Sequence, residues 1–209
     1  RRTPALLDPA GDHSLAKAIV DLRQWMSETQ MLEGDVGRRL DLALDRRALP
    51  FEAGEEARYQ VLWKGGGAVN LPAGEAVFRV EPGAAPRGAG RAGFRFELLV
   101  TTAAWISAFF EARDRFWSLT GPSLDPLVHV QELHEGRRHV TRTMTFDAGR
   151  RRVIVGTGPP DALQDAVEFP WVSAVRDPLG AFYEARAADF DAAPRHVIPV
   201  SNAGRAYTL

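Results

Sequence analysis

The chain contains the stretch Phe94-Arg95-Phe96-Glu97-Leu98-Leu99-Val100-Thr101, which decides the class of fold. Every second residue from Phe94 to Val100 is apolar, and the charged residues Arg95 and Glu97 stand between them. Because successive side chains of a β-strand point to opposite faces, a period of two places the apolar residues on one face. The stretch is therefore predicted to be a strand with one apolar face and one polar face.

Similar strand patterns recur on both sides of this stretch. They cover residues 57–63, 75–80, 113–119, 127–134, 138–146 and 151–155, and two more, 196–200 and 206–209, flank a turn at 201–204. Gly136-Arg137 is expected to close a hairpin. We expect a turn or short helix over Trp105–Phe110 and a loop over Gly156–Pro170. Consecutive strands with one apolar face indicate an antiparallel sheet whose other face contacts water.

One helix is predicted within this β-rich region. Asp177 is a preferred N-cap residue, and Pro178 follows it at the first helical position, where proline is favoured. The helix is expected to end near Asp189 and to carry Phe182 and Tyr183. The predicted fold class is therefore α+β, dominated by antiparallel strands, with one packed helix near residues 177–189.

The first 48 residues follow a different pattern. An apolar stripe recurs at helical spacing through Leu15, Ala18, Ile19, Leu22 and Met26, and a second stripe follows within 35–48. We predict a helical N-terminal appendage over residues 1–48, followed by a β-rich domain over residues 49–209. Because the chain ends inside a strand pattern, we expect this domain to be truncated at its C-terminus.

Composition and charge argue against several classes of function. The 209 residues include 26 Lys and Arg and 27 Asp and Glu, so the net charge is -1. A dedicated nucleic-acid-binding domain would carry a basic surplus. The absence of cysteine excludes disulfides, thiolate zinc sites and cysteine nucleophiles. No apolar run is long enough for a transmembrane helix, and no motif indicates a cofactor.

Aromatic residues provide the main lead to a function. Candidates on the predicted sheet and helix are Tyr59, Trp63, Phe78, Phe94, Phe96, Phe182 and Tyr183. We expect most of them to pack as core beneath the helix, and a gap left there would accept a lipid or another hydrophobic ligand. Asp177 is expected to cap the helix, and in the alternative interpretation it also contacts a ligand at the helix mouth.

Titratable side chains gather near the predicted hairpins. His134 and His139 would face each other across the strands, with Glu132 on the same face, which makes the two histidines candidate metal ligands. A solvated hairpin tip is the preferred interpretation, because no third strong ligand follows from the sequence. The turn arginines, Arg137, Arg138, Arg142 and 150–152, either form a patch for anionic headgroups or acidic polysaccharide or protect a solvated edge.

Short segments in a fixed order carry a family resemblance. They are 50–55 with Tyr59, 74–76, 113–116, 125–127, 135–138, 146–147, 177–183 with Arg186, 198–200 and 204–209. From Leu49 to Leu209 the chain resembles a bacterial family with a domain of unknown function, number 3108, whose members are typically exported. The resemblance implies a strongly curved, half-barrel-like sheet holding a helix, and a periplasmic or exported location. Gly180 departs from the family, which more often has Ser at this position, and no catalytic residue can be transferred.

Three hypotheses of function follow. The favoured one is non-enzymatic binding of an apolar or amphipathic ligand, or of a protein partner, in the cell envelope, since no catalytic constellation is visible. The second is a hydrolase acting on envelope glycans or lipids through Asp177, Glu135, or His134 with His139. The third is a structural or assembly module whose N-terminal helices dock on a partner.

Overall fold

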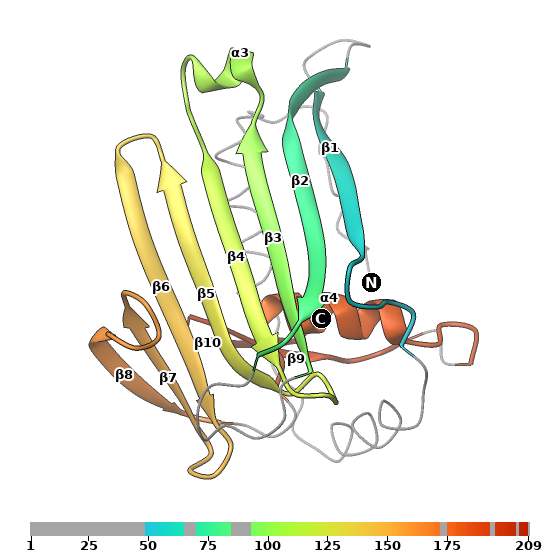
Figure 1. The fold of residues 1–209 in the computed structure, drawn as a ribbon, viewed down its shortest axis with the longest axis vertical. Helices are drawn as coiled ribbons and strands as arrows, with labels where there is room; N and C mark the ends of the chain where they lie inside the picture. Colours follow the sequence, from blue (N-terminus) through green and yellow to red (C-terminus); the bar gives the residue numbers. More distant parts are fainter. Residues whose placement is uncertain are drawn as a thin grey trace, which may run out of the picture.

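The structure is a computed structural model, and it describes residues 49–64, 70–84, 93–171, 175–192, 195–203 and 205–208. The helical appendage predicted for residues 1–48 lies outside the described residues. Within them, strands dominate and helices are few (Figure 1). The prediction of a mainly antiparallel fold with one packed helix near residues 177–189 is confirmed.

Eight strands form one open antiparallel sheet in which each strand pairs with its sequence neighbours. They are β1 (Glu56–Lys64), β2 (Asn70–Pro82), β3 (Phe94–Thr102), β4 (Arg113–Thr120), β5 (Pro126–Glu135), β6 (Arg138–Asp147), β7 (Arg152–Thr157) and β8 (Gln164–Pro170). The strand order follows the sequence, so β1 and β8 are the two edges of the sheet (Figure 1). Such an order needs only short connections, which antiparallel strands allow.

The remaining described elements are two helices and a separate hairpin. They are α3 (Ala104–Ser107), α4 (Pro178–Ala187), β9 (Pro199–Asn202) and β10 (Arg205–Thr208). Asp177 is the N-cap of α4, as predicted, and accepts hydrogen bonds from the amides of Leu179 and Gly180. The turn or short helix predicted over Trp105–Phe110 corresponds in part to α3, which begins one residue earlier and ends at Ser107. Neither described helix is long and apolar enough to cross a membrane.

Two local predictions are wrong. The loop expected over Gly156–Pro170 contains β8, which pairs with β7. Because β8 is an edge strand whose residues are almost all exposed, its sequence lacks the apolar alternation that identifies a half-buried strand. The turn expected over residues 201–204 is shorter, because Ser201 and Asn202 belong to β9 and Asn202 pairs with Arg205.

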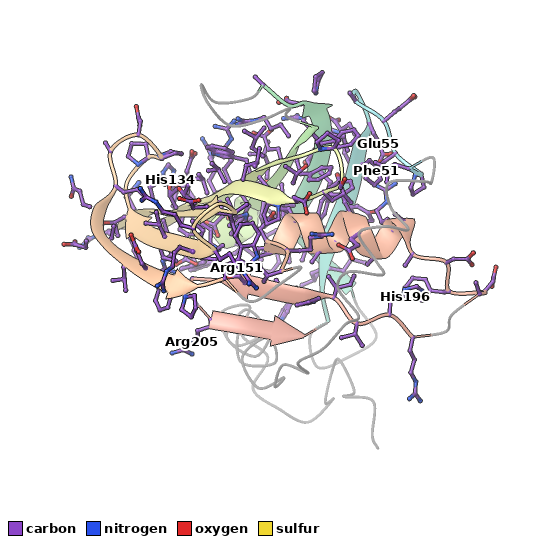
Figure 2. The ribbon with its side chains drawn as sticks, turned by 90° about the horizontal axis from the view of Figure 1, so that it is seen from below. Phe51, Glu55, His134, Arg151, His196 and Arg205 are labelled. Atoms are coloured by element: carbon purple, nitrogen blue, oxygen red, sulfur yellow. The ribbon has the colours of Figure 1, made fainter. Side chains whose placement is uncertain are left out.

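Helix α4 packs on one face of the sheet, against β3 and β4, and β9 packs against the helix. Figure 2 shows α4 and the β9–β10 hairpin on the same side of the sheet. The largest core cluster joins these layers through Phe51, Val80, Phe96, Leu124, Leu179 and Tyr183. Since full burial of one large apolar side chain stabilises a fold by about 1.5–3 kcal/mol, this cluster holds α4 in place.

The opposite face of the sheet is polar over β1 to β4. Arg79 bonds to Glu56 at 2.7 Å and to Glu97 at 3.4 Å, and Arg115 bonds to Glu97 at 2.6 Å. The partly exposed pair of Arg79 with Glu56 agrees with the predicted water-facing side, whereas Glu97 is buried. The polarity is not continuous, because Leu119, Val128 and Val130 are buried in a small apolar cluster with Trp117, the direct cross-strand partner of Glu97.

Candidate functional site

The aromatic residues predicted from the sequence meet between the sheet and α4. Phe96 of β3 stacks on Tyr183 of α4 with ring centroids 3.9 Å apart. Phe78 of β2 stacks on Phe182 of α4 at 4.7 Å, and Phe94 stacks on Phe96 at 5.8 Å. The face of the sheet that carries alternate aromatic residues is therefore the face that packs on the helix.

This aromatic cluster has a closed part and an open part. Phe96 and Tyr183 are fully buried, and Phe51 packs edge-on against both, so these three rings are core. Tyr59 on the edge strand β1 is 52% exposed and contacts Phe78 edge-on at 5.6 Å. A ligand can therefore touch Tyr59 at the edge of the cluster without entering the closed part.

Trp63 lies apart from the other predicted aromatics. Its register partner is Leu71, and its ring centroid is 6.3 Å from that of Trp105 in α3. Trp63 therefore belongs to the α3 end of the sheet rather than to the surface beneath α4.

The Tyr183 hydroxyl is buried and finds no hydrogen-bond partner within the described part of the chain. Burial raises the pKa of Tyr183 to about 12, although the nearby Arg186 cation acts in the opposite direction. Arg186 lies over the Tyr183 ring at 5.3 Å and pairs with Glu55 at 2.5 Å; Figure 2 labels Glu55 beside Phe51. A neutral hydroxyl with an unused donor and acceptor therefore adjoins an ion pair at the margin of the aromatic cluster.

Asp177 connects α4 to the sheet. Its Oδ1 accepts from the amides of Leu179 and Gly180 at 3.0 Å and from the Ser118 hydroxyl of β4 at 2.5 Å. Its Oδ2 has no partner among the described residues, and a Cβ at Gly180 would lie 2.9 Å from it. The helix cap predicted for Asp177 is therefore also a buried contact with the sheet.

The buried polar network continues along β5. The Ser118 hydroxyl lies 2.8 Å from His129 Nδ1, and Gln131 Nε2 lies 3.2 Å from His129 Nε2. Gln131 also donates to Asn202 of β9 at 2.9 Å. Since the Ser118 hydroxyl donates to Asp177, His129 Nδ1 must carry the proton that Ser118 accepts. The network thus ties β4, β5, β9 and the start of α4 together.

The ionised form of Asp177 is favoured in this network. Burial by itself would raise the pKa of Asp177, but the hydrogen bond and charge of His129, the Ser118 hydroxyl and the Gly180 amide together hold it below its ordinary value. His129 Nδ1 and Asp177 Oδ1 are 3.4 Å apart. The carboxylate therefore remains charged although it is fully buried.

Ser118, His129 and Asp177 have the residue types of a hydrolytic triad but a different geometry. In a working triad the serine bonds to one imidazole nitrogen and the carboxylate to the other. Here both groups lie at Nδ1, and the serine proton points to the carboxylate. All three side chains are also buried, so no substrate reaches the serine hydroxyl in this arrangement. The geometry is that of a structural connection.

Sequence reasoning missed Ser118, His129 and Gln131 as members of this network. They lie on the inward face of β4 and β5, since Ser118 pairs with Phe96 on one side and with His129 on the other. The sequence did contain a signal for this network. Polar residues stand at inward positions of an otherwise apolar strand face, and buried polar groups need hydrogen-bond partners.

A buried ion pair lies beside this network. Arg176 Nε donates to Glu184 of α4, and both side chains are almost fully buried. Arg176 Nη1 also bonds to Asp125 at 3.2 Å. The Arg176 backbone bonds to Pro199 and Ser201, which attaches the β9–β10 hairpin to the start of α4.

The predicted cross-strand pairing of His134 with His139 is confirmed, and their ring centroids are 4.7 Å apart. Within the described part of the chain, no group of three or more metal-ligating side chains is present, and metal binding stays a prediction. Both rings are exposed on the face of β5 opposite His129, so they do not meet Asp177. Glu135 lies at the same end of β5, about 20 Å along the strand from His129, which contacts Asp177, so the residues of the hydrolase hypothesis do not converge.

The turn arginines do not form one patch. Arg137 and Arg138 lie at the β5–β6 turn, whereas residues 150–152 lie at the β6–β7 turn. These turns are at opposite ends of β6, which Figure 1 shows at the top and bottom of the sheet. Ten residues of strand separate them by roughly 30 Å, so of the two alternatives the single arginine patch does not form.

Comparison with known proteins identifies a family. Residues 58–209 match the family model described as protein of unknown function (DUF3108), and the chain belongs to that family, as its sequence resemblance indicated. No curated protein and no solved structure matches the chain.

Proposed function

We propose that this member of the DUF3108 family is a non-enzymatic cell-envelope protein that binds an apolar or amphipathic ligand at the margin between α4 and strands β1 and β2. The periplasmic or exported location in this proposal comes from the resemblance to exported bacterial proteins. The same proposal includes a strongly curved, half-barrel-like sheet. Such curvature would deepen the margin between α4 and strands β1 and β2.

The observation that supports it is the buried Tyr183 hydroxyl, which has no hydrogen-bond partner among the described residues, beside an aromatic surface that opens to solvent at Tyr59. Leaving a buried polar group unpaired destabilises a fold by about 1–3 kcal/mol, so such a group calls for an explanation. Because Tyr183 is fully buried in the free protein, a ligand polar group would satisfy the hydroxyl only after side chains at the margin move to admit it.

The ligand would use two kinds of contact. Its apolar part packs against Tyr59, Phe78 and Phe182, which are partly exposed in the free protein. Its polar end lies near the Tyr183 hydroxyl and Arg186, whose guanidinium side chain is 33% exposed. Ligand sites commonly combine an apolar lining with a few placed polar groups.

The experiment measures binding of dansyl-labelled undecanoic acid to the 209-residue chain by fluorescence. Tyr183→Phe is expected to weaken binding on the order of tenfold by removing one hydrogen bond, without lowering the free energy of unfolding. Arg186→Gln is expected to weaken binding several-fold, whereas Arg115→Gln on the opposite face serves as the matched control and leaves it unchanged.

Two results would contradict the proposal. Equal affinity of Tyr183→Phe and the unmodified chain would mean that the ligand does not reach the hydroxyl. Failure of the unmodified chain to bind the probe, together with no copurifying lipid in native mass spectrometry, would identify the aromatic cluster as core only.

The hydrolase alternative receives less support from the site. Its candidate residues lie in separate places, and the buried Ser118–His129–Asp177 network lacks the hydrogen-bond order of a nucleophilic triad. The favoured hypothesis also allows a protein partner as the ligand. No specific feature of the described residues beneath α4 supports that form of it.

A further inference from the structure

The apolar face of the sheet extends beyond the part that α4 covers. Inward side chains of neighbouring strands form rows, because residues directly opposite each other share a face of the sheet. The row that contacts α4 contains Val80, Phe96 and Ser118, and each of these side chains is at most 1% exposed. Figure 1 shows α4 crossing one end of the sheet, whereas β2 and β3 continue well past it.

Two further inward rows lie farther along the strands, and together they are here called the apolar strip. One row contains Phe78, Leu98 and Phe116, and the other contains Tyr59, Ala76 and Val100. Five of these six residues are half-buried and Tyr59 is exposed, so burial decreases with distance from α4. The strip carries no charged residue, although the opposite face of the same strands carries the arginines and glutamates described above.

The apolar strip has a defined length and width. It begins at Tyr59 on the edge strand β1 and ends at buried polar residues, because Val100 pairs with Asp114 and Phe116 pairs with Gln131. It crosses four strands, so it is roughly 14 Å long, about the length of an extended chain of eleven carbon atoms. Its two rows lie about 7 Å apart, since they are two residues apart along each strand. These dimensions suit one hydrocarbon chain.

Helix α4 runs alongside the apolar strip. The helix begins near β4, where Asp177 bonds to Ser118, and reaches β2, where Phe182 stacks on Phe78 at 4.7 Å. Phe78 therefore belongs both to the strip and to the margin at which the ligand is proposed to bind. A chain that starts at this margin can continue across the strands without meeting a charged side chain before Asp114.

We propose that the apolar strip holds one unbranched acyl chain of about eleven carbon atoms, lying across β1 to β4 and alongside α4. This inference rests on the proposed function and names the class of its ligand, a single-chain amphiphile. The polar end stays near Tyr183 and Arg186, and the far end of the chain reaches Phe116. A hydrocarbon chain fits this surface because it brings no polar group that the strip would leave unpaired.

The first experiment measures displacement of dansyl-labelled undecanoic acid from the 209-residue chain by unlabelled alkanoates of increasing length. Affinity is expected to rise about fourfold for each added methylene up to about twelve carbons and then to stay level, because a longer chain extends past the strip. Dodecanoyl lysophosphatidylglycerol in the same assay distinguishes the source of the chain. Tighter binding than dodecanoate would identify a lipid, and weaker binding a free fatty acid.

The second experiment compares the same substitution at two adjacent positions of β3. Leu98→Ala is expected to weaken dodecanoate binding on the order of tenfold and to leave hexanoate binding unchanged, because a six-carbon chain ends before β3. Leu99→Ala is the matched control, since Leu99 is also half-buried but points to the opposite face, and it leaves both affinities unchanged. Leu98→Met conserves volume and keeps dodecanoate binding, which separates loss of the contact from loss of the fold.

Three results would overturn this inference while the proposed function stands. They are equal loss of dodecanoate binding in Leu98→Ala and Leu99→Ala, equal loss of hexanoate and dodecanoate binding in Leu98→Ala, and an affinity that stops rising at six carbons. The last result would mean that protein side chains already fill the strip. Failure of the unmodified chain to bind any of these acids would instead overturn the proposed function together with this inference.

Discussion

Asp177 combines two roles in one carboxylate. Its Oδ1 caps the first turn of α4 and also accepts a hydrogen bond from the Ser118 hydroxyl, so the start of the helix is positioned by the sheet. Its Oδ2 remains unpaired within the described residues. The residue is thus both an ordinary N-cap and a buried charge whose stability depends on its neighbours.

The first prediction concerns how the stability contributed by Asp177 changes at acidic pH. Because the pKa of Asp177 is lower in the folded chain than the value of about 3.9 in an unfolded chain, its stabilisation is complete above that pH and is lost as pH falls through the folded-state pKa. Asp177→Asn keeps the cap but removes the charge. We expect the variant to be less stable by about 1–3 kcal/mol at neutral pH, and the difference to shrink in acid. Urea unfolding at stepwise lower pH measures it, and a pH-independent difference would contradict the prediction.

The second prediction concerns Gly180. A Cβ there would lie 2.9 Å from Asp177 Oδ2, so any side chain forces a small shift. Gly180→Ser adds a hydroxyl that can donate to this unpaired oxygen, whereas Gly180→Ala adds only the contact. We expect the serine variant to exceed the alanine variant in unfolding free energy by about 1 kcal/mol. The reverse order in thermal or urea unfolding would show that the hydroxyl does not reach Oδ2.

At the scale of the element, α4 is held by charges as well as by apolar contacts. Arg176 and Glu184 form an ion pair with side chains only 2% and 3% exposed, whereas Arg186 and Glu55 form one at the margin, 33% and 26% exposed. A buried pair is far more sensitive to loss of one partner, because the remaining charge is left in a medium that solvates it poorly.

The third prediction compares these two ion pairs by the same substitution. Glu184→Gln is expected to lower the free energy of unfolding by about 3 kcal/mol, since it removes the buried carboxylate and leaves the buried Arg176 charge to its bond with the half-exposed Asp125. Glu55→Gln is the matched control and is expected to cost less than about 1 kcal/mol. Urea unfolding of both variants provides the measurement. Equal losses would mean that burial does not set the strength of the pair at α4.

At the scale of the whole molecule, the sheet is open and its edges differ. Residues of β5 are mostly buried between two strands, whereas residues of β8 are almost all exposed and, among the described strands, pair with β7 alone. Local opening needs least energy where few apolar contacts are broken. The sheet is therefore expected to open from its β8 edge.

The fourth prediction follows from this difference and is tested by hydrogen exchange. Backbone amides of β8 that bond to β7 are expected to exchange at least about tenfold faster than those of β5, after correction for intrinsic rates. The amides of β5 are the internal reference. Equal protection of β5 and β8 would show that the sheet opens as one unit.

Several features follow from local patterns alone. The alternation that begins at Phe94 reproduces β3, the cap at Asp177-Pro178 reproduces the start of α4, and the Gly136-Arg137 turn brings His134 opposite His139. Each depends on interactions between near neighbours in the chain, so strand period, cap preference and turn position are sufficient. The lack of cysteine and the near balance of charges are likewise properties of composition alone.

Other features required the assembled fold. Ser118 and Asp177 are 59 positions apart, and their contact depends on the register of β4 with β5 and on the packing of α4. The separation of the two arginine turns depends on the length and direction of β6. The residues of β8 lack an apolar face, and the segment is a strand because its backbone pairs with that of β7. Contacts between distant segments arise from strand pairing and helix packing together, and the periodicity of a single segment carries no information about them.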